Sequence, residues 1–239
     1  MRIRLPLGRS LFFLCVLLFC LVALLPMRLV LGWLGLGERG FAAREVVGSI
    51  WIGGAREAQL GSVPIGDVAA RLRTLPLLLG RARIDVDRDG DADALEAGLT
   101  ASRHGFAIED AVASVDTAAA FAPLPIQGFD LSDLTVRFAD GACQSAEGLV
   151  KARVAGNVGG ISLPTSFSGD ARCEGGALLL PLASQTGQER LSLRLFDDGR
   201  YRVELSLPAA DEPLRQKLTA AGFAPVGANL LLRVQGMLG

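Results

Sequence analysis

Residues 191–207 (LSLRLFDDGRYRVELSL) contain two runs in which apolar and polar residues alternate, and an Asp-Asp-Gly sequence lies between them. From position 201 to position 207 every odd-numbered residue is apolar and every even-numbered residue is polar. A period of two residues is typical of a β-strand with one buried face, and Asp-Gly is typical of a hairpin turn. The stretch therefore predicts an antiparallel β-hairpin.

Four further stretches alternate in a similar but less regular way; they are Leu134–Phe138, Leu149–Val154, Ser166–Cys173 and Leu230–Val234. Glycine, proline and aspartate separate such runs, which recur about every ten residues, as expected of an antiparallel β domain. Strands do not alternate with helices, which argues against a parallel sheet. We expect residues 41–239 to form one mainly β domain with a curved or rolled antiparallel sheet.

A short helix is expected in the C-terminal region of this domain. Asp211 suits the N-cap position, and Gly222 follows as a stop signal. Leu214 and Leu218 lie four residues apart and therefore share one face of the helix. A second, shorter helix is expected over residues 116–121.

The N-terminal region is far more apolar than the rest of the chain. Residues 11–25 (LFFLCVLLFCLVALL) are uninterrupted by a polar side chain other than cysteine, and arginine precedes them at positions 2, 4 and 9. A span over residues 8–27 has the roughly 20 residues that cross a bilayer. By the positive-inside rule, residues 1–7 are then cytoplasmic and the rest is exported. Residues 28–40 are expected to link this transmembrane anchor to the β domain.

A cleaved signal peptide is the alternative interpretation of the same region. Such a peptide needs small residues just before the cleavage point, and residues 35–37 (GLG) are the nearest candidate. Without residues 1–28 the chain holds 20 basic and 25 acidic residues, because those 28 residues include four arginines and no acid. A weakly acidic body of this kind has no electrostatic attraction to an anionic lipid surface.

The composition excludes several classes of function. Lysine occurs only at positions 151 and 217, and the formal net charge is −1, so we expect no nucleic-acid partner. The chain has one histidine and no cysteine cluster, and it lacks the glycine-rich loops that bind nucleotides. We therefore expect no cofactor.

Cys143 and Cys173 are the two cysteines outside the apolar N-terminal run. In an oxidising exported compartment, two such residues are expected to pair as a structural disulfide. The alternative is a nucleophilic thiol, which would need a basic partner, and His104 is the one histidine in the sequence. His104 lies in an apparent turn, where it is expected to be a surface residue rather than a catalytic base.

Residues 85–96 (DVDRDGDADALE) match the calcium-loop pattern D-x-D-x-D-G-x5-E. Carboxylate oxygens at these positions are suitable calcium ligands, and the glycine permits the sharp turn. However, residues 81–86 alternate like a strand, and Pro76 and Gly80 disfavour an entering helix. The alternative is a polar turn over residues 88–91 that joins two strands. The sequence leaves metal binding by Asp85 to Glu96 open.

Several short stretches, taken in order, resemble the type II secretion system protein N family. They are residues 48–55 (GSIWIGGA), 65–66 (IG), 71–81 (RLRTLPLLLGR) and 198–201 (DGRY), with Gly236 near the C-terminus. Together these stretches extend over most of the chain. The resemblance implies an inner-membrane component of the bacterial general secretion pathway with its body in the periplasm.

Trp51, with Gly48 and Gly53 on either side, is the most distinctive feature of the first of these stretches. From the residues alone, Trp51 is expected to be a packing anchor on a strand, with glycines that permit a bulge or close backbone approach. A docking role for Trp51, Gly48 and Gly53 is the functional alternative.

The leading functional hypothesis is a non-enzymatic, single-pass inner-membrane subunit that acts as a periplasmic scaffold in type II secretion. Its expected partners are other secretion components, namely the inner-membrane platform and, as an open alternative, the outer-membrane channel. A second hypothesis is a periplasmic module that binds a lipid or another hydrophobic ligand in a groove of the rolled sheet. A third is an exported hydrolase, which would need convergent polar groups in a pocket.

Overall fold

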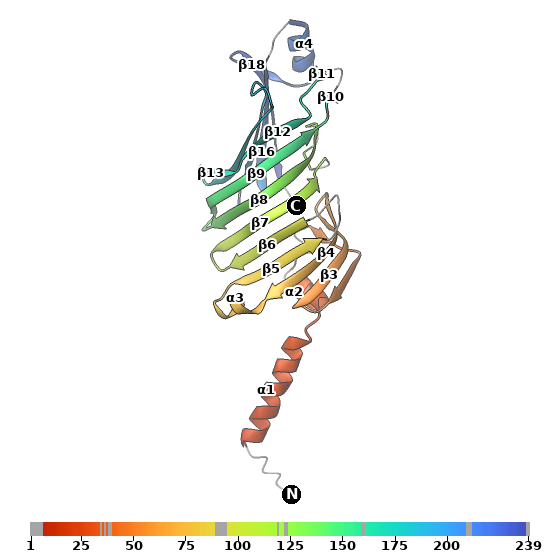
Figure 1. The fold of residues 1–239 in the computed structure, drawn as a ribbon, viewed down its shortest axis with the longest axis vertical. Coiled ribbons are helices and arrows are strands. Elements are labelled where there is room, and N and C mark those ends of the chain that lie inside the picture. Colours follow the sequence, from red (N-terminus) through yellow and green to blue (C-terminus); the bar gives the residue numbers. More distant parts are fainter. Residues whose placement is uncertain are drawn as a thin grey trace.

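The computed structural model describes residues 7–33, 35, 37, 40–88, 95–118, 120–121, 124–158, 161–208 and 212–237. An N-terminal helix projects from one end of a long rolled sheet, and another helix lies at the opposite end (Figure 1). The helices are α1 (Leu7–Ala23), α2 (Met27–Trp33), α3 (Thr74–Leu78) and α4 (Glu212–Ala220).

The strands vary from short bridging segments to long, strongly bent elements. The first nine are β1 (Phe41–Ala42), β2 (Glu45–Gly48), β3 (Ile52–Leu60), β4 (Val63–Arg73), β5 (Ala82–Arg88), β6 (Leu95–Ser102), β7 (Gly105–Asp116), β8 (Ile126–Ala139) and β9 (Ala142–Val154). The others are β10 (Asn157–Val158), β11 (Ile161–Ser162), β12 (Ser166–Asp170), β13 (Arg172–Glu174), β14 (Ala177–Ala183), β15 (Arg190–Leu195), β16 (Arg200–Pro208), β17 (Ala224–Val226) and β18 (Asn229–Met237).

Among the described residues, sixteen strands form one sheet, with the main order β1-β3-β4-β5-β6-β7-β8-β9-β12-β14-β15-β16-β18-β17. Strands β2 and β13 pair with β3 and β14 respectively, while β10 and β11 form a separate pair. All these pairs are antiparallel, and from β3 to β9 each strand pairs with the next one along the chain. The expected mainly β, antiparallel architecture is confirmed.

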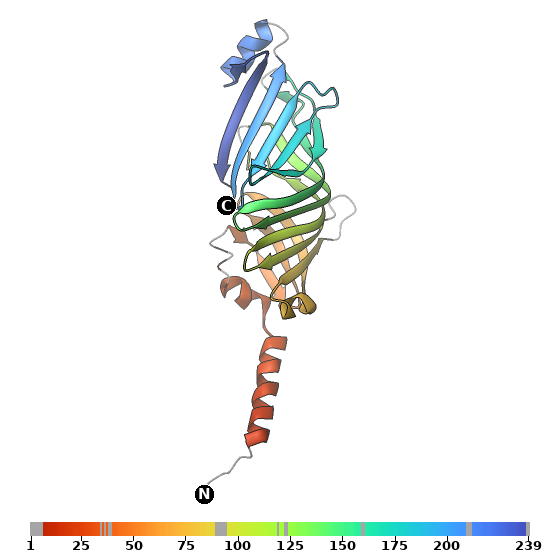
Figure 2. The ribbon, with the colours of Figure 1, turned by 90° about the vertical axis from the view of Figure 1, so that its left-hand side faces the viewer.

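The sheet is rolled rather than flat (Figures 1 and 2). Strand β4 contacts β7, although β5 and β6 separate the two in the sheet order, so the sheet curls back on itself. Register shifts coincide with positive φ angles at Glu57, Asp110 and Asp133. The amide of Glu57 donates to Asp67 Oδ1 at 2.7 Å, and that of Asp110 donates to Thr135 Oγ1 at 3.0 Å. These bulges bend the strands and account for part of the curvature.

The hairpin expected over residues 191–207 is present. Strands β15 and β16 pair from Leu195↔Tyr201 onward, and Gly199 adopts a φ of +82° in the turn between them. The four odd-numbered residues of 201–207 are buried, whereas their even-numbered neighbours are more exposed. The alternation therefore predicted both the strand and the face that it buries.

Helix α4 also matches its expected position, and Leu218 is its buried residue among those described. Gly222 has a φ of +93°; its amide donates to Thr219 O, and the amide of Phe223 donates to Leu218 O. This is the Schellman arrangement, in which a left-handed glycine ends a helix. Asp211, the expected N-cap, lies outside the described residues.

The short helix expected over residues 116–121 is wrong. Strand β7 continues to Asp116, and the described residues that follow form turns, in which the amide of Ala120 donates to Thr117 O at 3.0 Å. Phe121 is buried and packs edge-on against Phe129 and Tyr201, and the Tyr201 hydroxyl donates to Ala120 O at 2.9 Å. Tertiary packing therefore determines this segment, which fills the interior of the roll.

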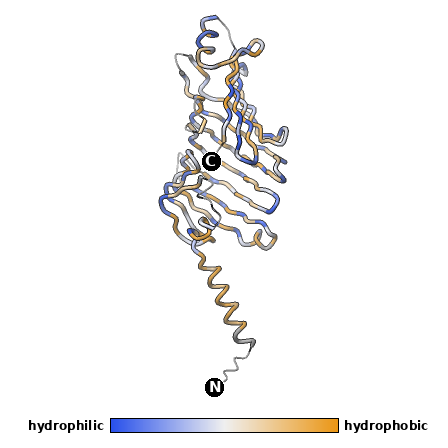
Figure 3. The backbone as a smooth tube through the Cα atoms, turned by 180° about the vertical axis from the view of Figure 1, so that it is seen from behind, coloured by the Kyte–Doolittle hydropathy of each residue, from blue (hydrophilic) through white to orange (hydrophobic). Residues whose placement is uncertain are grey.

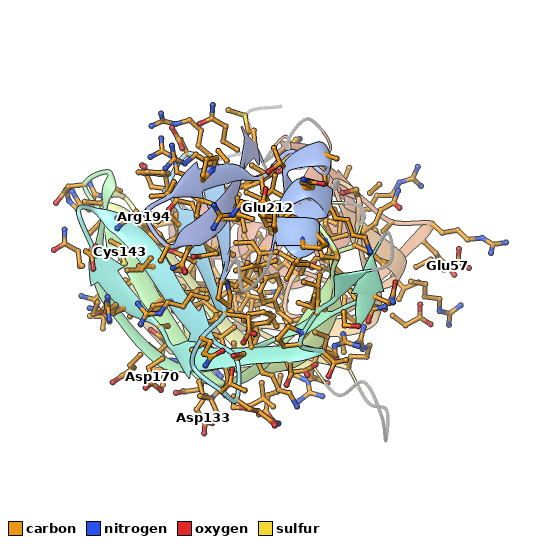
Figure 4. All side chains as sticks on the ribbon, turned by 90° about the horizontal axis from the view of Figure 1, so that it is seen from above. Glu57, Asp133, Cys143, Asp170, Arg194 and Glu212 are labelled. Atoms are coloured by element: carbon orange, nitrogen blue, oxygen red, sulfur yellow. A yellow bond between two sulfur atoms is a disulfide. The ribbon has the colours of Figure 1, made fainter. Side chains whose placement is uncertain are left out.

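Apolar side chains gather inside the roll, and the labelled Glu57, Asp133 and Asp170 lie on its outside (Figure 4). Most of the fully buried side chains come from strands β8–β18 and from α4, which lies between β16 and β17. The largest of them are Phe167, Leu182, Leu191, Leu230 and, on α4, Leu218. In β3 and β7 the buried residues are alanines. The well-packed core therefore belongs to the C-terminal half of the sheet.

The apolar N-terminal region is helical but not continuous over the expected span of residues 8–27. Helix α1 ends at Ala23, and α2 begins at Met27. Pro26 lies between them; proline lacks an amide hydrogen and disfavours a helical conformation of the preceding residue. No helix within the described residues combines the length and the apolar character needed to cross a membrane.

Candidate functional site

The stretch 48–55, with its tryptophan between glycines, forms the turn of the β2–β3 hairpin and the start of β3. Gly48 pairs with Gly53, and the amide of Ser49 donates to Ile52 O at 3.0 Å. Trp51 therefore lies in the turn, so its expected position on a strand is wrong. Glycines flank tight turns as readily as they flank bulges, and spacing alone could not separate these alternatives.

The tip of this hairpin is attached to the junction between α1 and α2. The Trp51 indole Nε1 donates to Val22 O at 3.1 Å, and the amide of Ile50 donates to Leu25 O at 3.1 Å. Pro26 also forms an isolated β-bridge with Ser49. Because the last carbonyls of a helix lack helical partners, the indole caps the C-terminal end of α1. We call residues 48–53, together with 22–27, the helix collar.

Both glycines of the helix collar are sterically required. Gly48 has a φ of +85°, and a Cβ added there would lie 2.5 Å from Ile52 O. A Cβ on Gly53 would lie 2.8 Å from Ser49 O and 2.5 Å from the sulfur of Met27. Any larger residue at either position would therefore displace the backbone of the turn, and at position 53 it would also push the Met27 side chain aside.

Cys143 on β9 and Cys173 on β13 are joined by a disulfide, with their Cα atoms 5.5 Å apart. The bond links two strands that are not neighbours in the sheet order. It leaves neither sulfur as a free thiol. His104, the basic partner considered for a nucleophilic cysteine, lies in the exposed β6–β7 turn, with Nδ1 3.7 Å from Asp140 Oδ1.

The calcium-like stretch begins on β5, whose Asp85 and Asp87 both have arginine partners. Asp85 forms ion pairs with Arg73 and with Arg83, the latter at 3.3 Å, while Asp87 lies 3.6 Å from Arg71. Burial acts to raise the pKa of Asp85, but hydrogen bonds from the two arginines outweigh burial and lower that pKa.

Because Asp85 and Asp87 already pair with arginines, their carboxylates are less available as metal ligands. Arg83 also reaches Glu109 on β7 at 2.5 Å, so an ion-pair row crosses β4, β5 and β7 on the outer face. Within the described ranges no group of acidic, histidine or cysteine side chains could hold a metal ion. Residues 89–94, the middle of the calcium-like pattern, are outside the described part of the chain.

The concave face of the N-terminal half of the sheet encloses a cavity of about 780 Å³. Strands β6 and β7 supply its floor, including Leu99, Ala111 and Ala113, and the β3–β4 turn and Met237 face them. None of the described residues that line it is charged, and Ser62 is the sole hydroxyl-bearing one. We call this space the apolar cavity.

A groove in the rolled sheet was one of the hypotheses drawn from the sequence, but residue patterns did not locate the apolar cavity within the sheet. Its lining comes from segments between Leu60 and Met237, and only the rolling of the sheet brings these together. The signal for such a groove is the content of small residues: strands β6 and β7 carry alanine where the later strands carry leucine or phenylalanine. Small residues on a concave face leave space that larger ones would fill.

Comparisons with known proteins identify the family of the chain. The family described as type II secretion system (T2SS), protein N, matches residues 39–228. The chain is also 28% identical over 230 residues to the type II secretion system protein N of Vibrio cholerae serotype O1, an alignment that covers 89% of this chain and 90% of the relative. No solved structure matches the chain significantly. Because the family match covers most of its length, the chain belongs to the type II secretion system protein N family.

Proposed function

We propose that this chain is a non-enzymatic, single-pass inner-membrane subunit of the type II secretion machinery. In this proposal α1 anchors the chain, residues 1–7 are cytoplasmic, and the β roll is a periplasmic scaffold for other secretion components. Family membership supports a role in secretion. The observation that carries the scaffold role is the helix collar, because it fixes the orientation of the roll relative to α1.

The character of α1 supports the anchor. The large apolar side chains from Leu11 to Val22 are exposed, and α1 is apolar over this stretch (Figure 3). A helix that is apolar all round needs an apolar environment. Its 17 residues extend roughly 26 Å at 1.5 Å per residue, a few ångströms less than a typical hydrocarbon core. Local thinning of the bilayer can accommodate such a difference at modest cost.

The disulfide supports the periplasmic location. Disulfides persist in oxidising compartments such as the periplasm and are rare in the cytosol. A tethered scaffold also gains from confinement, because the anchor raises the effective concentration of the roll for partners in the same membrane layer.

Site-specific photocrosslinking in intact cells tests the scaffold role. Ile52 is 70% exposed at the helix collar, and Val226 is 57% exposed beside α4, at the end of the roll distant from α1 (Figure 1). We expect a crosslinker at Ile52 to capture inner-membrane secretion components. Val226 reports whether the distant end contacts a different component, such as the outer-membrane channel. Capture of unrelated envelope proteins alone from both positions would contradict the proposal.

Membrane retention tests the anchor separately. The full chain should stay in the membrane fraction after an alkaline wash, and the roll should be protease-sensitive from the periplasmic side. Recovery of a soluble chain that lacks its first thirty or so residues would instead identify a cleaved signal peptide.

A second candidate function is favoured by one observation, the apolar cavity. A periplasmic module that binds a lipid or another hydrophobic ligand needs an uncharged recess of several hundred cubic ångströms, and the cavity meets that need. Mass spectrometry of the full chain purified in mild detergent should then find a retained apolar ligand. A purified chain with no such ligand would argue against this second function.

A further inference from the structure

We propose that the apolar cavity holds one linear acyl chain of a membrane lipid. This inference rests on the second candidate function and specifies both the site and the ligand class. The site consists of the concave face of β5–β7 on one side, with the β3–β4 turn and the end of β18 on the other.

The chemistry of the lining selects an aliphatic occupant. Val86, Leu95 and Ile108 are representative of the lining, which has no charged member among the described residues. A peptide or sugar placed there would bury amide or hydroxyl groups with almost no side-chain partner, which is costly. An acyl chain has no such groups, and its transfer from water onto this lining is favourable in proportion to the area covered.

The arrangement of the lining favours a linear molecule. Alternate residues of β7, namely Ala111, Ala113 and Val115, line the cavity in a row along that strand. On β6 the alternate residues Leu95, Ala97 and Leu99 do the same, and β6 pairs with β7. The recess therefore follows the strand direction, as an extended chain requires. Its volume of about 780 Å³ falls within the range of small-molecule sites.

The lining residues that stay exposed mark the opening of the cavity. Leu60 is 50% exposed and Met237 is 63% exposed, whereas Ala111 and Ala113 are buried. Gly61 and Ser62 in the β3–β4 turn are exposed as well. An acyl chain can therefore enter between this turn and the end of β18, while its polar headgroup stays in solvent. The packed segment around Phe121 closes the interior beyond Ala120.

Leu99 and Val112 provide a matched pair for the test. Leu99 lines the cavity and is 41% exposed; Val112 is 42% exposed on the adjacent strand and points to the opposite face. Leu99→Glu places a carboxylate in the cavity, and Val112→Glu places the same group outside it. Both positions reach water, so neither change should prevent folding, and circular dichroism checks that both chains keep their β structure.

The measurement is the binding of cis-parinaric acid, a linear polyene fatty acid, to the full chain in mild detergent. We expect saturable binding to the wild type and to Val112→Glu, and affinity lowered about tenfold or more in Leu99→Glu, because an ionised group in an apolar recess is unfavourable. Ala113→Leu, which fills the recess without charge, should reduce the number of probe molecules bound.

The outcomes separate the site from the second candidate function. Equal binding by all variants would overturn the cavity as the site and would leave a hydrophobic ligand bound elsewhere on the roll. Absence of both probe binding and co-purified lipid would overturn the site and the second function together. Tighter binding of an apolar peptide than of the fatty acid, with the same loss in Leu99→Glu, would replace the acyl chain by a protein segment.

Discussion

Strands β3–β7 and, apart from the separate β10–β11 pair, strands β8–β18 belong to one continuous sheet, but they stabilise it in different ways. In the C-terminal half, leucine, valine and phenylalanine side chains such as Phe167, Leu182 and Val203 fill the interior. In the N-terminal half the buried residues are alanines and Gly98, and the interior is partly open. The outer face there carries the ion-pair row that includes Arg83 and Asp85.

This difference shows how one sheet can combine a stable half with a half that is available for binding. Buried apolar volume supplies most of the folding free energy of a domain. Exposed ion pairs contribute much less, typically up to about 1 kcal/mol each. The C-terminal half therefore supports the hollow half through the pairing of β7 with β8, the two strands at the boundary between the halves.

The largest expected effect is in the packed half. Phe167 is 1% exposed, and Phe167→Ala should lower the free energy of unfolding by about 4 kcal/mol, because the cavity that it leaves cannot collapse completely. Leu99→Ala, in the hollow half, should cost less than about 1 kcal/mol because Leu99 already borders open space. Urea unfolding followed by circular dichroism measures both values. Similar losses for the two variants would contradict the division into halves.

The second effect concerns the disulfide. Replacing Cys143 and Cys173 by serine should lower the free energy of unfolding by about 3 kcal/mol, since the bond closes a loop with a sequence separation of 30. Cys15→Ser with Cys20→Ser is the matched control, because both are free cysteines, and it should leave stability unchanged. Hydrogen exchange should locate the loosening in β13 and β14. Faster exchange confined to β3–β5 would show that the disulfide stabilises the N-terminal half of the sheet. That result would contradict the division into a packed C-terminal half and a hollow N-terminal half.

The strands were predictable because their signal is local. Alternation over residues 201–207 depends only on which face is buried, and the Asp-Gly turn fixes the hairpin within the same few residues. The closure of the roll depends on bulges at Glu57, Asp110 and Asp133, whose effect on curvature accumulates across strands. Residue spacing alone carries no comparable signal, so a groove in the rolled sheet could be proposed but the position of the apolar cavity could not be predicted.

The third effect concerns the contribution of the ion-pair row to the stability of the hollow half. Asp85→Asn should lower the free energy of unfolding by about 1 kcal/mol at neutral pH, since the Asp85 side chain is 25% exposed and solvent screens it in part. The pKa of Asp85 lies below its ordinary value of 3.8 in the folded chain. Its contribution is therefore present above pH 3.8 and is lost as the pH falls through the lowered pKa.

Unfolding curves over a range of pH check this prediction. The difference between wild type and Asp85→Asn should narrow as the pH falls below 3.8. Asp170→Asn is a suitable control because Asp170 has no ion pair within the described part of the chain. A difference that stays constant with pH would assign the loss to altered packing of β5.

The calcium-like pattern shows the same limit of local information. Residues 85–96 match the required spacing of acidic residues and glycine. However, Asp85 and Asp87 lie on β5, and the neighbouring strand β4 carries two arginines, Arg71 and Arg73. Register across strands, which the sequence does not specify directly, gives both carboxylates cationic partners. For Trp51 the flanking glycines were recognised, but the partner, Val22 O, is 29 residues away.

The smallest expected effect concerns the helix collar, where the hollow half joins α1. Trp51→Phe keeps the aromatic ring but removes the indole donor to Val22 O, so global stability should fall by about 1 kcal/mol or less. The local change should be larger: the amide of Ile50, which donates to Leu25 O, should exchange faster as the hairpin tip separates from the helix end. Trp33→Phe is the control, since Trp33 is 77% exposed. An unchanged exchange rate of the Ile50 amide in Trp51→Phe would mean that backbone hydrogen bonds alone attach the hairpin tip to the end of α1. The fixed orientation of the roll would then depend on the tight turn that Gly48 and Gly53 permit, and not on the tryptophan.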